Sequence, residues 1–402
     1  MTFVRDTFYK DAFVEQARTA AGGQSSAPQA GPQTARLVPN PASIQPTHLG
    51  IDLTQHGVDG RALVASALAA GRWYPVTGSA GVYVSAVQPK MIEPALLQGD
   101  RGVVSAMDSV EADAVDYLVA FDLSHFDLGF ALGTDHPRVD WSDRAPDSQR
   151  AESAGPDGIG TTAPLATTGM VNPALLPRVA ATFTGGFKRE HGAFRYGALS
   201  QRNRGSHYGF IEHGTVFSTL QPGLSTLYVL DDGSINMKTW TEADRALLAR
   251  IRDARQNGVP LIEYDAASGV SGPGELVNNW GAGNWSGSAN DKLRTLRAGA
   301  CLQDGGGKHY LIYGYFSTAT PAAMVRVFQA YGCRYAMHLD MNALEHTYMA
   351  LYSVAAGELR VQHLIRDMAE VDKKGGTPLA PRFLSFPDDR DFFYLLRRPE
   401  PR

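Results

Sequence analysis

The sequence predicts an α/β fold of the mixed α+β kind: a mixed β-sheet core with flanking helices and long surface loops. Two observations support this prediction. Short apolar runs bounded by turn residues alternate with helical patterns along the second half of the chain. Glycine occupies 42 of the 402 positions, above the usual share of about 7%, which favours a turn-rich sheet protein over a helical bundle.

The chain divides into four predicted regions. Residues 1–47 are an amphipathic head and a flexible linker, because the Gln-, Ser-, Ala- and Pro-rich stretch 24–47 shows no periodicity. Residues 48–114 are an N-terminal extension that packs on the body, residues 115–370 are the main domain, and residues 371–402 are a C-terminal tail. The first residues lack a long apolar run after a basic start, so we expect no intact signal peptide there.

Turn and cap residues define the elements of the body. Asp232–Gly233 provides the positive φ angles of one hairpin turn, and a second hairpin turns at Asp304–Gly305. Thr241 begins the longest helical pattern and Gly258 ends it. The predicted elements are a helix over 61–71, strands over 117–123 and 126–133, a hairpin over 224–240, a helix over 241–258, a strand over 259–265, a hairpin over 297–316, a helix over 321–332, strands over 333–342 and 347–354, and long loops over 140–162 and 272–291.

Composition excludes several classes of protein. The formal charge is −4, from 37 basic and 41 acidic residues, and 44% of the residues are hydrophobic. Global disorder requires lower hydrophobicity, and binding to nucleic acid through bulk positive charge requires a basic chain. We therefore expect no nucleic-acid partner. No apolar run reaches the ~18–20 residues of a membrane-spanning helix, so no transmembrane segment is expected.

The two cysteines, Cys301 and Cys333, have neither zinc-ligand nor C-x-x-C spacing. Two buried thiols are the favoured interpretation. A single disulfide is the alternative if the strands that carry them are neighbours. No metal and no cofactor are expected.

The stretch 333–342 carries the first group of candidate site residues. Side chains alternate along a strand, so His338, Asp340 and Asn342 are expected on one face. Polar side chains at the end of a strand, just before a loop, are typical of the sites of open α/β sheets.

The stretch 183–192 carries the second group. Gly185 and Gly186 follow a predicted strand, where paired glycines let the backbone approach a ligand closely. The surrounding region is locally basic, which suits a phosphate-bearing substrate. Arg297, at the start of a later strand, could hold a phosphate with two hydrogen bonds. The further candidates in these regions are Thr184, Lys188, His191 and Tyr208.

Four stretches together resemble the phosphodiester glycosidase family, in particular its bacterial branch. The first is TFTGGFK, similar to the N-G-G-F signature of that family with Thr184 in place of the asparagine. The second is STLYVLDDGSINMKTW with the Arg255-Gln256-Asn257 that follows. The third is Arg297-Ala298-Gly299, and the fourth is the stretch from Tyr335 to Asn342. Their order and spacing fit over residues 115–365.

The resemblance implies hydrolysis of a sugar-1-phosphodiester, or a related glycan, at the anomeric C–O bond, and it favours an extracytoplasmic or secreted location. Asp340 would stabilise the oxocarbenium-like centre or activate water. Arg297, with Lys188 and the amides of the paired glycines, would hold the phosphate. Glu263 is the candidate second carboxylate, with Asp265 as an alternative. The residues expected to contact substrate are Thr184, Gly185, Gly186, Lys188, His191, Tyr208, Gln256, Asn257, His338 and Asn342, with Trp280 and Trp285 as secondary candidates for stacking on sugar.

Two other functions compete with this one. A metal-dependent hydrolase could use His338, Asp340, Asn342 and His346 as ligands, with His191 or His207 completing the set, although no H-E-x-x-H spacing occurs. A non-catalytic glycan-binding or envelope-associated module with the same fold is the other, motivated by the threonine at position 184.

Overall fold

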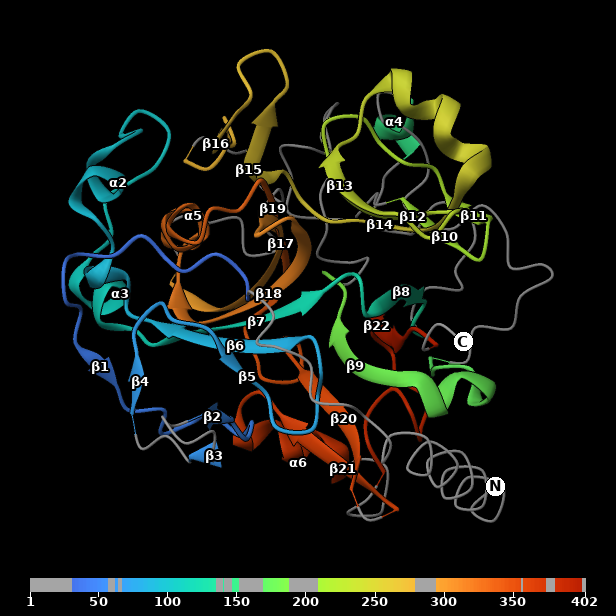
Figure 1. Ribbon diagram of the computed structural model, residues 1–402. Helices are drawn as coiled ribbons and strands as arrows, with labels where there is room; N and C mark the ends of the chain where they lie inside the picture. The colour runs from blue at the N-terminus through green and yellow to red at the C-terminus, as the bar shows by residue number, and fades with distance from the viewer. Residues whose placement is uncertain are drawn as a thin grey trace.

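The computed structural model describes residues 31–56, 62–63, 67–134, 140, 147–151, 169–187, 209–278, 294–355, 357–373 and 380–399. In this part of the chain strands dominate and form three large sheets and two short ones (Figure 1). Every strand pairing in it is antiparallel. The predicted sheet core is therefore present, but the fold is β-rich rather than a mixed sheet flanked by helices.

The largest sheet has eight strands in the order β16-β15-β19-β17-β18-β7-β6-β5. Its bounds are β5 (Tyr74–Pro75), β6 (Val82–Val87), β7 (Asp116–Asp122), β15 (Pro260–Asp265), β16 (Val270–Pro273), β17 (Thr295–Gly305), β18 (Lys308–Ala319) and β19 (Tyr335–Met341). Strands β5 and β6 lie within residues 48–114, the predicted N-terminal extension. That extension is therefore part of the main sheet.

Helix α5 (Pro321–Ala330) lies beside β17, β18 and β19 (Figure 1). Thr320 caps it by accepting a hydrogen bond from the Ala323 amide at 3.3 Å, and proline fits its first turn. Gly299 and Gly314, paired across β17 and β18, make room for it: a Cβ on Gly299 would lie 2.8 Å from Met324 and 3.0 Å from Phe328. This helix agrees with the helix predicted over 321–332, and the cap by Thr320 is an addition from the structure.

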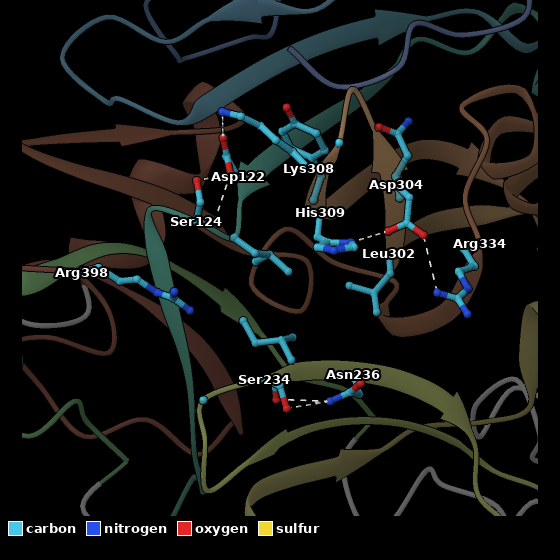
Figure 2. Close-up of a pocket in the computed structure, with 16 residues that line it drawn as sticks. Asp122, Ser124, Ser234, Asn236, Leu302, Asp304, Lys308, His309, Arg334 and Arg398 are labelled. Carbon is cyan, nitrogen blue, oxygen red and sulfur yellow. Dashed lines mark hydrogen bonds and ion pairs between the residues drawn. The ribbon is translucent and has the colours of Figure 1, made fainter. Parts of the chain in front are cut away.

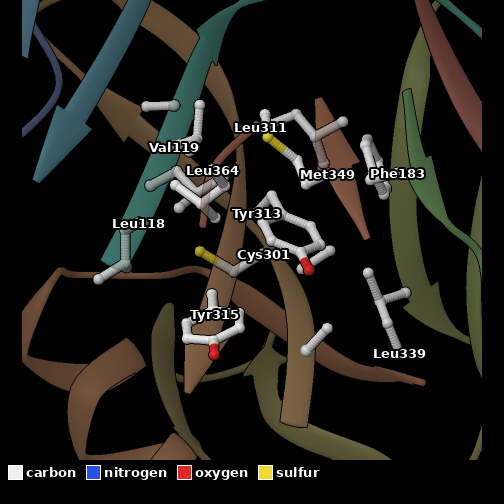
Figure 3. Packing of buried hydrophobic residues seen from close by; sticks show 14 of the residues in the cluster. Leu118, Val119, Phe183, Cys301, Leu311, Tyr313, Tyr315, Leu339, Met349 and Leu364 are labelled. Carbon is white, nitrogen blue, oxygen red and sulfur yellow. The ribbon is translucent and has the colours of Figure 1, made fainter. Parts of the chain in front are cut away.

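A five-stranded sheet packs against the eight-stranded one. Its order is β21-β20-β9-β22-β8. Phe183 of this sheet and Tyr313 of the larger sheet have ring centroids 5.4 Å apart within the shared core (Figure 3). The bounds are β8 (Phe126–Ala131), β9 (Val179–Thr184), β20 (Met349–Ala355), β21 (Glu358–His363) and β22 (Phe392–Arg397).

The second five-stranded sheet has the order β11-β10-β14-β12-β13. Its strands are β10 (Phe210–Glu212), β11 (Thr215–Ser218), β12 (Ser225–Leu230), β13 (Ile235–Thr239) and β14 (Ile251–Gln256). Two-stranded sheets join β1 (Ser43–Ile44) with β4 (Leu68–Ala69) and β2 (Gln55–His56) with β3 (Ala62–Leu63).

The remaining helices are short. They are α2 (Pro94–Gln98), α3 (Ser109–Asp113), α4 (Asp147–Arg150) and α6 (Ala369–Asp372), and the 3₁₀ helices Pro89–Met91, Pro173–Arg178, Glu242–Arg250 and Arg366–Met368. None of the helices in the described ranges is long and apolar enough to cross a membrane.

Two helix predictions are wrong. The pattern over 241–258 is a 3₁₀ helix only as far as Arg250, and Ile251–Gln256 is a strand. Hydrogen bonding to strands on both sides overrides the helical propensity of these residues. The stretch 61–71 contains the strands β3 and β4 instead of a helix.

Several predicted turns and connections also differ in detail. β7 and β8 have nearly the predicted bounds, but they enter different sheets instead of lying side by side. The turn between β17 and β18 has its positive φ angles at Gly306 (58°) and Gly307 (76°), two residues beyond the predicted start of the turn. In the turn at Asp232–Gly233 only the glycine has a positive φ, 82°.

Both predicted terminal segments contribute to the body. Within the expected linker, the Arg36 amide donates to the Ala330 carbonyl at 2.8 Å, and Ile44 is buried. Within the expected C-terminal tail, β22 is an inner strand between β9 and β8. Residues 31–47 and 392–397 are thus parts of the folded domain.

Cys301 of β17 and Cys333, just before β19, form a disulfide with Cα atoms 5.9 Å apart. The prediction of two free thiols is therefore wrong. The alternative is correct because β17 and β19 are neighbours in the eight-stranded sheet.

Loss of this disulfide is expected to destabilise the fold. The cysteines are 32 residues apart in sequence. Without the crosslink the unfolded chain gains conformational entropy, so a Cys301→Ser/Cys333→Ser protein should lose about 3–4 kcal/mol of unfolding free energy. Guanidinium unfolding with and without dithiothreitol measures the effect. Reductant should lower the midpoint of the parent and leave the double variant unchanged; equal midpoints for oxidised parent and variant would contradict this expectation.

Candidate active site

Asp340 lies at the end of β19 and forms an ion pair with Arg390. The side chain is nearly buried, with 4% of the residue exposed. Its Oδ2 atom lies 2.7 Å from Nη1 of Arg390, and its Oδ1 atom accepts a hydrogen bond from the Met341 amide at 2.9 Å. Both oxygens thus have fixed partners, so the carboxylate is held in one orientation.

Arg390 also contacts His346, in the loop after β19. Its Nη2 atom lies 2.5 Å from Nε2 of the imidazole, while Nδ1 lies 2.8 Å from the Met341 carbonyl. A carbonyl can only accept, so Nδ1 carries the proton and Nε2 accepts from the guanidinium. Arg390 therefore joins Asp340 to His346.

A second carboxylate, Glu345, completes this group, which we call the Asp340 cluster: Asp340, Glu345, His346 and Arg390. The Glu345 Oε1 atom lies 3.3 Å from His346 Nε2, and its side chain is 41% exposed. The cluster therefore combines one buried carboxylate with one that solvent reaches.

The end of β9 lies directly beside this cluster. The Thr184 hydroxyl donates to the His346 carbonyl at 2.5 Å, and the Gly185 amide donates to the Asp391 carbonyl at 2.8 Å. A Cβ on Gly186 would lie 2.7 Å from Oδ1 of Asn257, so this position requires glycine. The predicted strand end and the predicted glycine pair are thus brought together.

Asn257 and Arg255, at the end of β14, connect the three sheets at this point. Nδ2 of Asn257 donates to the carbonyls of His338 and Leu339 at 2.7 and 3.0 Å, and its Oδ1 accepts from the Phe187 amide at 3.1 Å. Arg255 donates from Nε to Asp391 at 3.0 Å and from Nη2 to the Phe187 carbonyl at 2.9 Å. Both side chains are buried and position the strand ends.

Arg297 does not contact Asp340, contrary to the predicted arrangement. It is fully buried, donates from Nε to the Ala319 carbonyl at 2.8 Å, and its Nη1 lies 3.1 Å from His338 Nε2. Burial lowers the pKa of Arg297 to about 9, against the attraction of Glu111. A guanidinium with no exposed surface is poorly placed to hold a phosphate.

His338 is also fully buried, so contact with a sugar hydroxyl is not supported. Burial, together with the charge of Arg297, holds its pKa well below the usual value. Strict alternation along β19 would place His338 and Asp340 together. A register irregularity, in which Arg297 opposes Met341 and Gly299 opposes His338, turns their side chains toward different partners.

Gln256 and Glu263 lie elsewhere. The Gln256 amide bonds to the backbone at Gly209 and Gln221 and to the hydroxyl of Thr226, which is a structural role. Glu263 accepts from the Thr239 hydroxyl at 2.5 Å. Its neighbour Ile262 pairs with Ala336 in an antiparallel register. Glu263 is therefore level with Tyr335, five residues before Asp340, which is roughly 17 Å along the strand.

Asn342 is exposed at the end of β19 with φ 79°, and its Oδ1 accepts from the Thr295 hydroxyl at 3.1 Å. It is two residues beyond Asp340 in the chain. Asp265 is exposed and bonded within its own turn. Lys188, His191, Tyr208, Trp280 and Trp285 lie outside the described residues.

The sequence prediction missed Arg390, Asp391, Arg255 and Glu345. The charged run 388–391 stands directly before the strongly apolar stretch 392–396. A short run of aromatic and aliphatic residues is typical of a buried strand. The charged run directly before it was the signal that could have pointed to these residues.

The arrangement does not resemble a metal site. Nε2 of His338 faces Arg297, and Nε2 of His346 faces Arg390, so these two candidate ligands each meet a guanidinium. His191 and His207, the other candidate histidines, lie outside the described residues. The residues that the structure describes contain no group of three His, Cys, Asp or Glu side chains able to hold a metal ion.

Glu212, at the end of β10, gives the protein a measurable pH dependence of stability. Burial, opposed by a hydrogen bond from Leu132 and assisted by the charges of Asp253 and Asp391, raises the pKa of Glu212 to about 8. The unfolded chain ionises Glu212 at a lower pH than the folded protein does. The favourable contribution of this carboxyl group is therefore complete below its pKa in the unfolded chain and is lost as the pH rises through its pKa in the folded protein.

We therefore expect the unfolding free energy of the parent to fall by roughly 3 kcal/mol more than that of Glu212→Gln between pH 5 and pH 8. Urea unfolding of both proteins at several pH values measures the difference. Parallel pH profiles for the two proteins would show that Glu212 is ionised in the folded state.

Comparison with known proteins finds distant structural similarity. The zebrafish N-acetylglucosamine-1-phosphodiester α-N-acetylglucosaminidase catalytic domain, auto-inhibited by its pro-peptide, is 10% identical at a TM-score of 0.41, with 80% of this chain and 85% of that chain covered. A hypothetical protein from Synechocystis is 12% identical at a TM-score of 0.35, with 87% of this chain and 68% of that chain covered.

No family model and no curated protein matches the chain. The structural similarities are distant, and neither places the chain in the bacterial branch that the motifs resemble. An assignment of function therefore has to be argued from the residues themselves.

Proposed function

We propose that this protein is a hydrolase that cleaves a sugar-1-phosphodiester at the anomeric C–O bond. One observation carries the proposal. At the end of β19 the Asp340 cluster holds a buried carboxylate, that of Asp340, against Arg390. The glycine pair that follows β9 lies beside this cluster, and its second carboxylate, that of Glu345, reaches solvent. The four family-like stretches of the sequence supply the choice of substrate class.

The chemistry needs a carboxylate fixed beside the anomeric carbon, because positive charge develops on the sugar there. As the bond from that carbon to the phosphate oxygen breaks, its electron pair leaves with the phosphate, which is already a stable anion. Asp340 stabilises the positive charge that develops on the sugar. Water adds to the anomeric carbon and loses one proton, so the products are a free sugar and a phosphomonoester.

Glu345 replaces Glu263, which was predicted from the sequence, as the proposed second carboxylate. Its carboxylate is on the loop that carries His346, it reaches solvent, and it can accept the proton of the attacking water. Lys188 and His191, which follow the glycine pair in the sequence, remain the proposed phosphate contacts. Arg297 then has a positioning role, because its contact with His338 holds β19 in place.

The proposal is tested by incubating the protein with a panel of sugar-1-phosphodiesters and p-nitrophenyl glycosides in water enriched in ¹⁸O. We expect a reducing sugar that carries the label and a phosphomonoester that does not. Label in the phosphate would identify a phosphodiesterase that cleaves P–O, and absence of any free sugar with tight binding of the substrate would favour the non-catalytic binding module.

A Glu345→Gln protein is expected to release sugar roughly 100-fold more slowly, because loss of a general base usually costs 10²–10⁴-fold. Azide, which needs no deprotonation, should restore turnover by forming the glycosyl azide. Glu358→Gln, at an exposed position of β21, is the matched control and should keep the parent rate. A parent-like rate for Glu345→Gln would remove this residue from the scheme.

A further inference from the structure

A second hollow, distant from the Asp340 cluster, lies between three hairpin or turn segments (Figure 2). Its volume is about 550 Å³, within the range of small-molecule sites. The turn after β7, the tip of the β12–β13 hairpin and the end of the β17–β18 hairpin form its walls. Arg334, just before β19, and Arg398, just after β22, stand at its margin (Figure 2).

The inner lining of this hollow is partly apolar. Leu123, Ile235 and Leu302 come from three different strand ends, and each is only half-buried. Half-buried apolar side chains that surround a hollow lose further contact with water when a hydrocarbon group covers them, at about 25 cal/mol per Å². The lining therefore favours a ligand with an apolar body.

The margin carries several basic side chains. Lys308, Arg334 and Arg398 line the hollow together with His309, and the carboxylates Asp122 and Asp304 line it as well. Arg398 also pairs with Asp127, at 3.0 Å from its Nε atom. Asp304 is shared between two basic groups, at 2.6 Å from His309 Nδ1 and 3.6 Å from Arg334 Nη1.

The basic groups are held in place rather than free to swing away. The Arg334 guanidinium lies 4.2 Å from the ring centroid of Tyr264, and the Lys308 ammonium lies 2.6 Å from Asp122, which is fully buried. A preformed arrangement reduces the entropy lost when a ligand binds.

The hollow is separate from the candidate active site. Arg297 opposes Met341 at one end of β17, whereas Leu302 opposes Tyr335 toward the other. Asp304 is seven residues beyond Arg297, which is roughly 23 Å along the strand. A ligand in the hollow therefore does not contact the Asp340 cluster.

From this geometry we propose that the hollow is a binding site for a small organic phosphate monoester with an apolar body, its charged group beside Arg334 and His309 and its hydrocarbon part against Leu302 and Ile235. Arg334 and His309 lie on either side of Asp304 (Figure 2), and basic groups so placed match a doubly charged phosphate better than a neutral ligand. The site is independent of the proposed hydrolysis.

Phenyl phosphate is the probe, with inorganic phosphate and phenol as its two halves, and binding is measured by calorimetry. We expect phenyl phosphate to bind the parent at least tenfold more tightly than either half. Arg334→Gln and Leu302→Asp should each weaken binding at least tenfold, whereas Arg360→Gln, an exposed arginine of β21, and Asp340→Asn should leave it unchanged.

Thermal melting confirms that each variant is folded. Equal binding of phenyl phosphate and inorganic phosphate would reveal adventitious anion binding only and would overturn the proposal, as would the absence of binding. Loss of binding in Asp340→Asn, with Arg334→Gln unaffected, would place the probe in the candidate active site and would equally overturn it.

Discussion

Replacement of Asp340 by asparagine is expected to reduce sugar release by roughly 10³-fold at saturating substrate. Asparagine has nearly the same shape and keeps an oxygen for the hydrogen bond from Arg390, but it lacks the charge that stabilises the anomeric centre. The loss should therefore fall on kcat, with KM changed little, because the missing interaction forms mainly in the transition state.

This substitution also leaves Arg390 buried without its anionic partner, so the variant should be less stable by about 3–5 kcal/mol. Asp340→Asn/Arg390→Gln separates the two effects. The double variant should regain part of the lost stability, measured by urea unfolding, and should remain inactive. An Asp340→Asn protein with the parent kcat would remove the carboxylate from the mechanism.

The second large effect is expected at the buried pair between Arg255 and Asp391. Both side chains are wholly inaccessible, and the same arginine donates to the Phe187 carbonyl. Arg255→Met should lower the unfolding free energy by about 3–5 kcal/mol, because the buried Asp391 carboxylate loses its cationic partner. The Gly133 amide, which donates to the same carboxylate at 3.1 Å, compensates only in part.

Denaturant unfolding measures this loss, and the exposed pair of Arg250 with Asp231 is the control. Arg250→Gln should leave the unfolding midpoint almost unchanged, since solvent screens an exposed pair. If the Arg255 and Arg250 substitutions had similar small effects, the ion pair at the junction of the three sheets would not contribute to the stability of the site.

The sequence was most informative where local rules decide the structure. α5 forms as predicted because a threonine cap, an N-terminal proline and a following glycine act within one helix. The β12–β13 hairpin forms for a similar reason: Gly233 adopts the positive φ that its turn requires. Asp340 and the Thr184–Gly186 stretch were likewise placed at strand ends, where the structure has them.

The sequence was least informative where distant segments meet. Arg390 is 50 residues from Asp340 along the chain, and no local pattern predicts that pairing. The irregularity between β17 and β19 likewise depends on the facing strand, so alternation along β19 alone assigned His338 and Asp340 to the same surroundings. The role of Glu263 failed for the same reason, since only the strand register fixes its distance from the site.

The position of β22 has a consequence for synthesis. β8 and β9 are made early, yet the strand that joins them lies at residues 392–397, and it is preceded by the arginine that holds Asp340. Until the ribosome has delivered that strand, two apolar edges stay open and contacts of very high sequence separation are still to form. The nascent chain is therefore exposed to aggregation until residues 392–397 have emerged, and the Asp340 cluster assembles only after Arg390 is available.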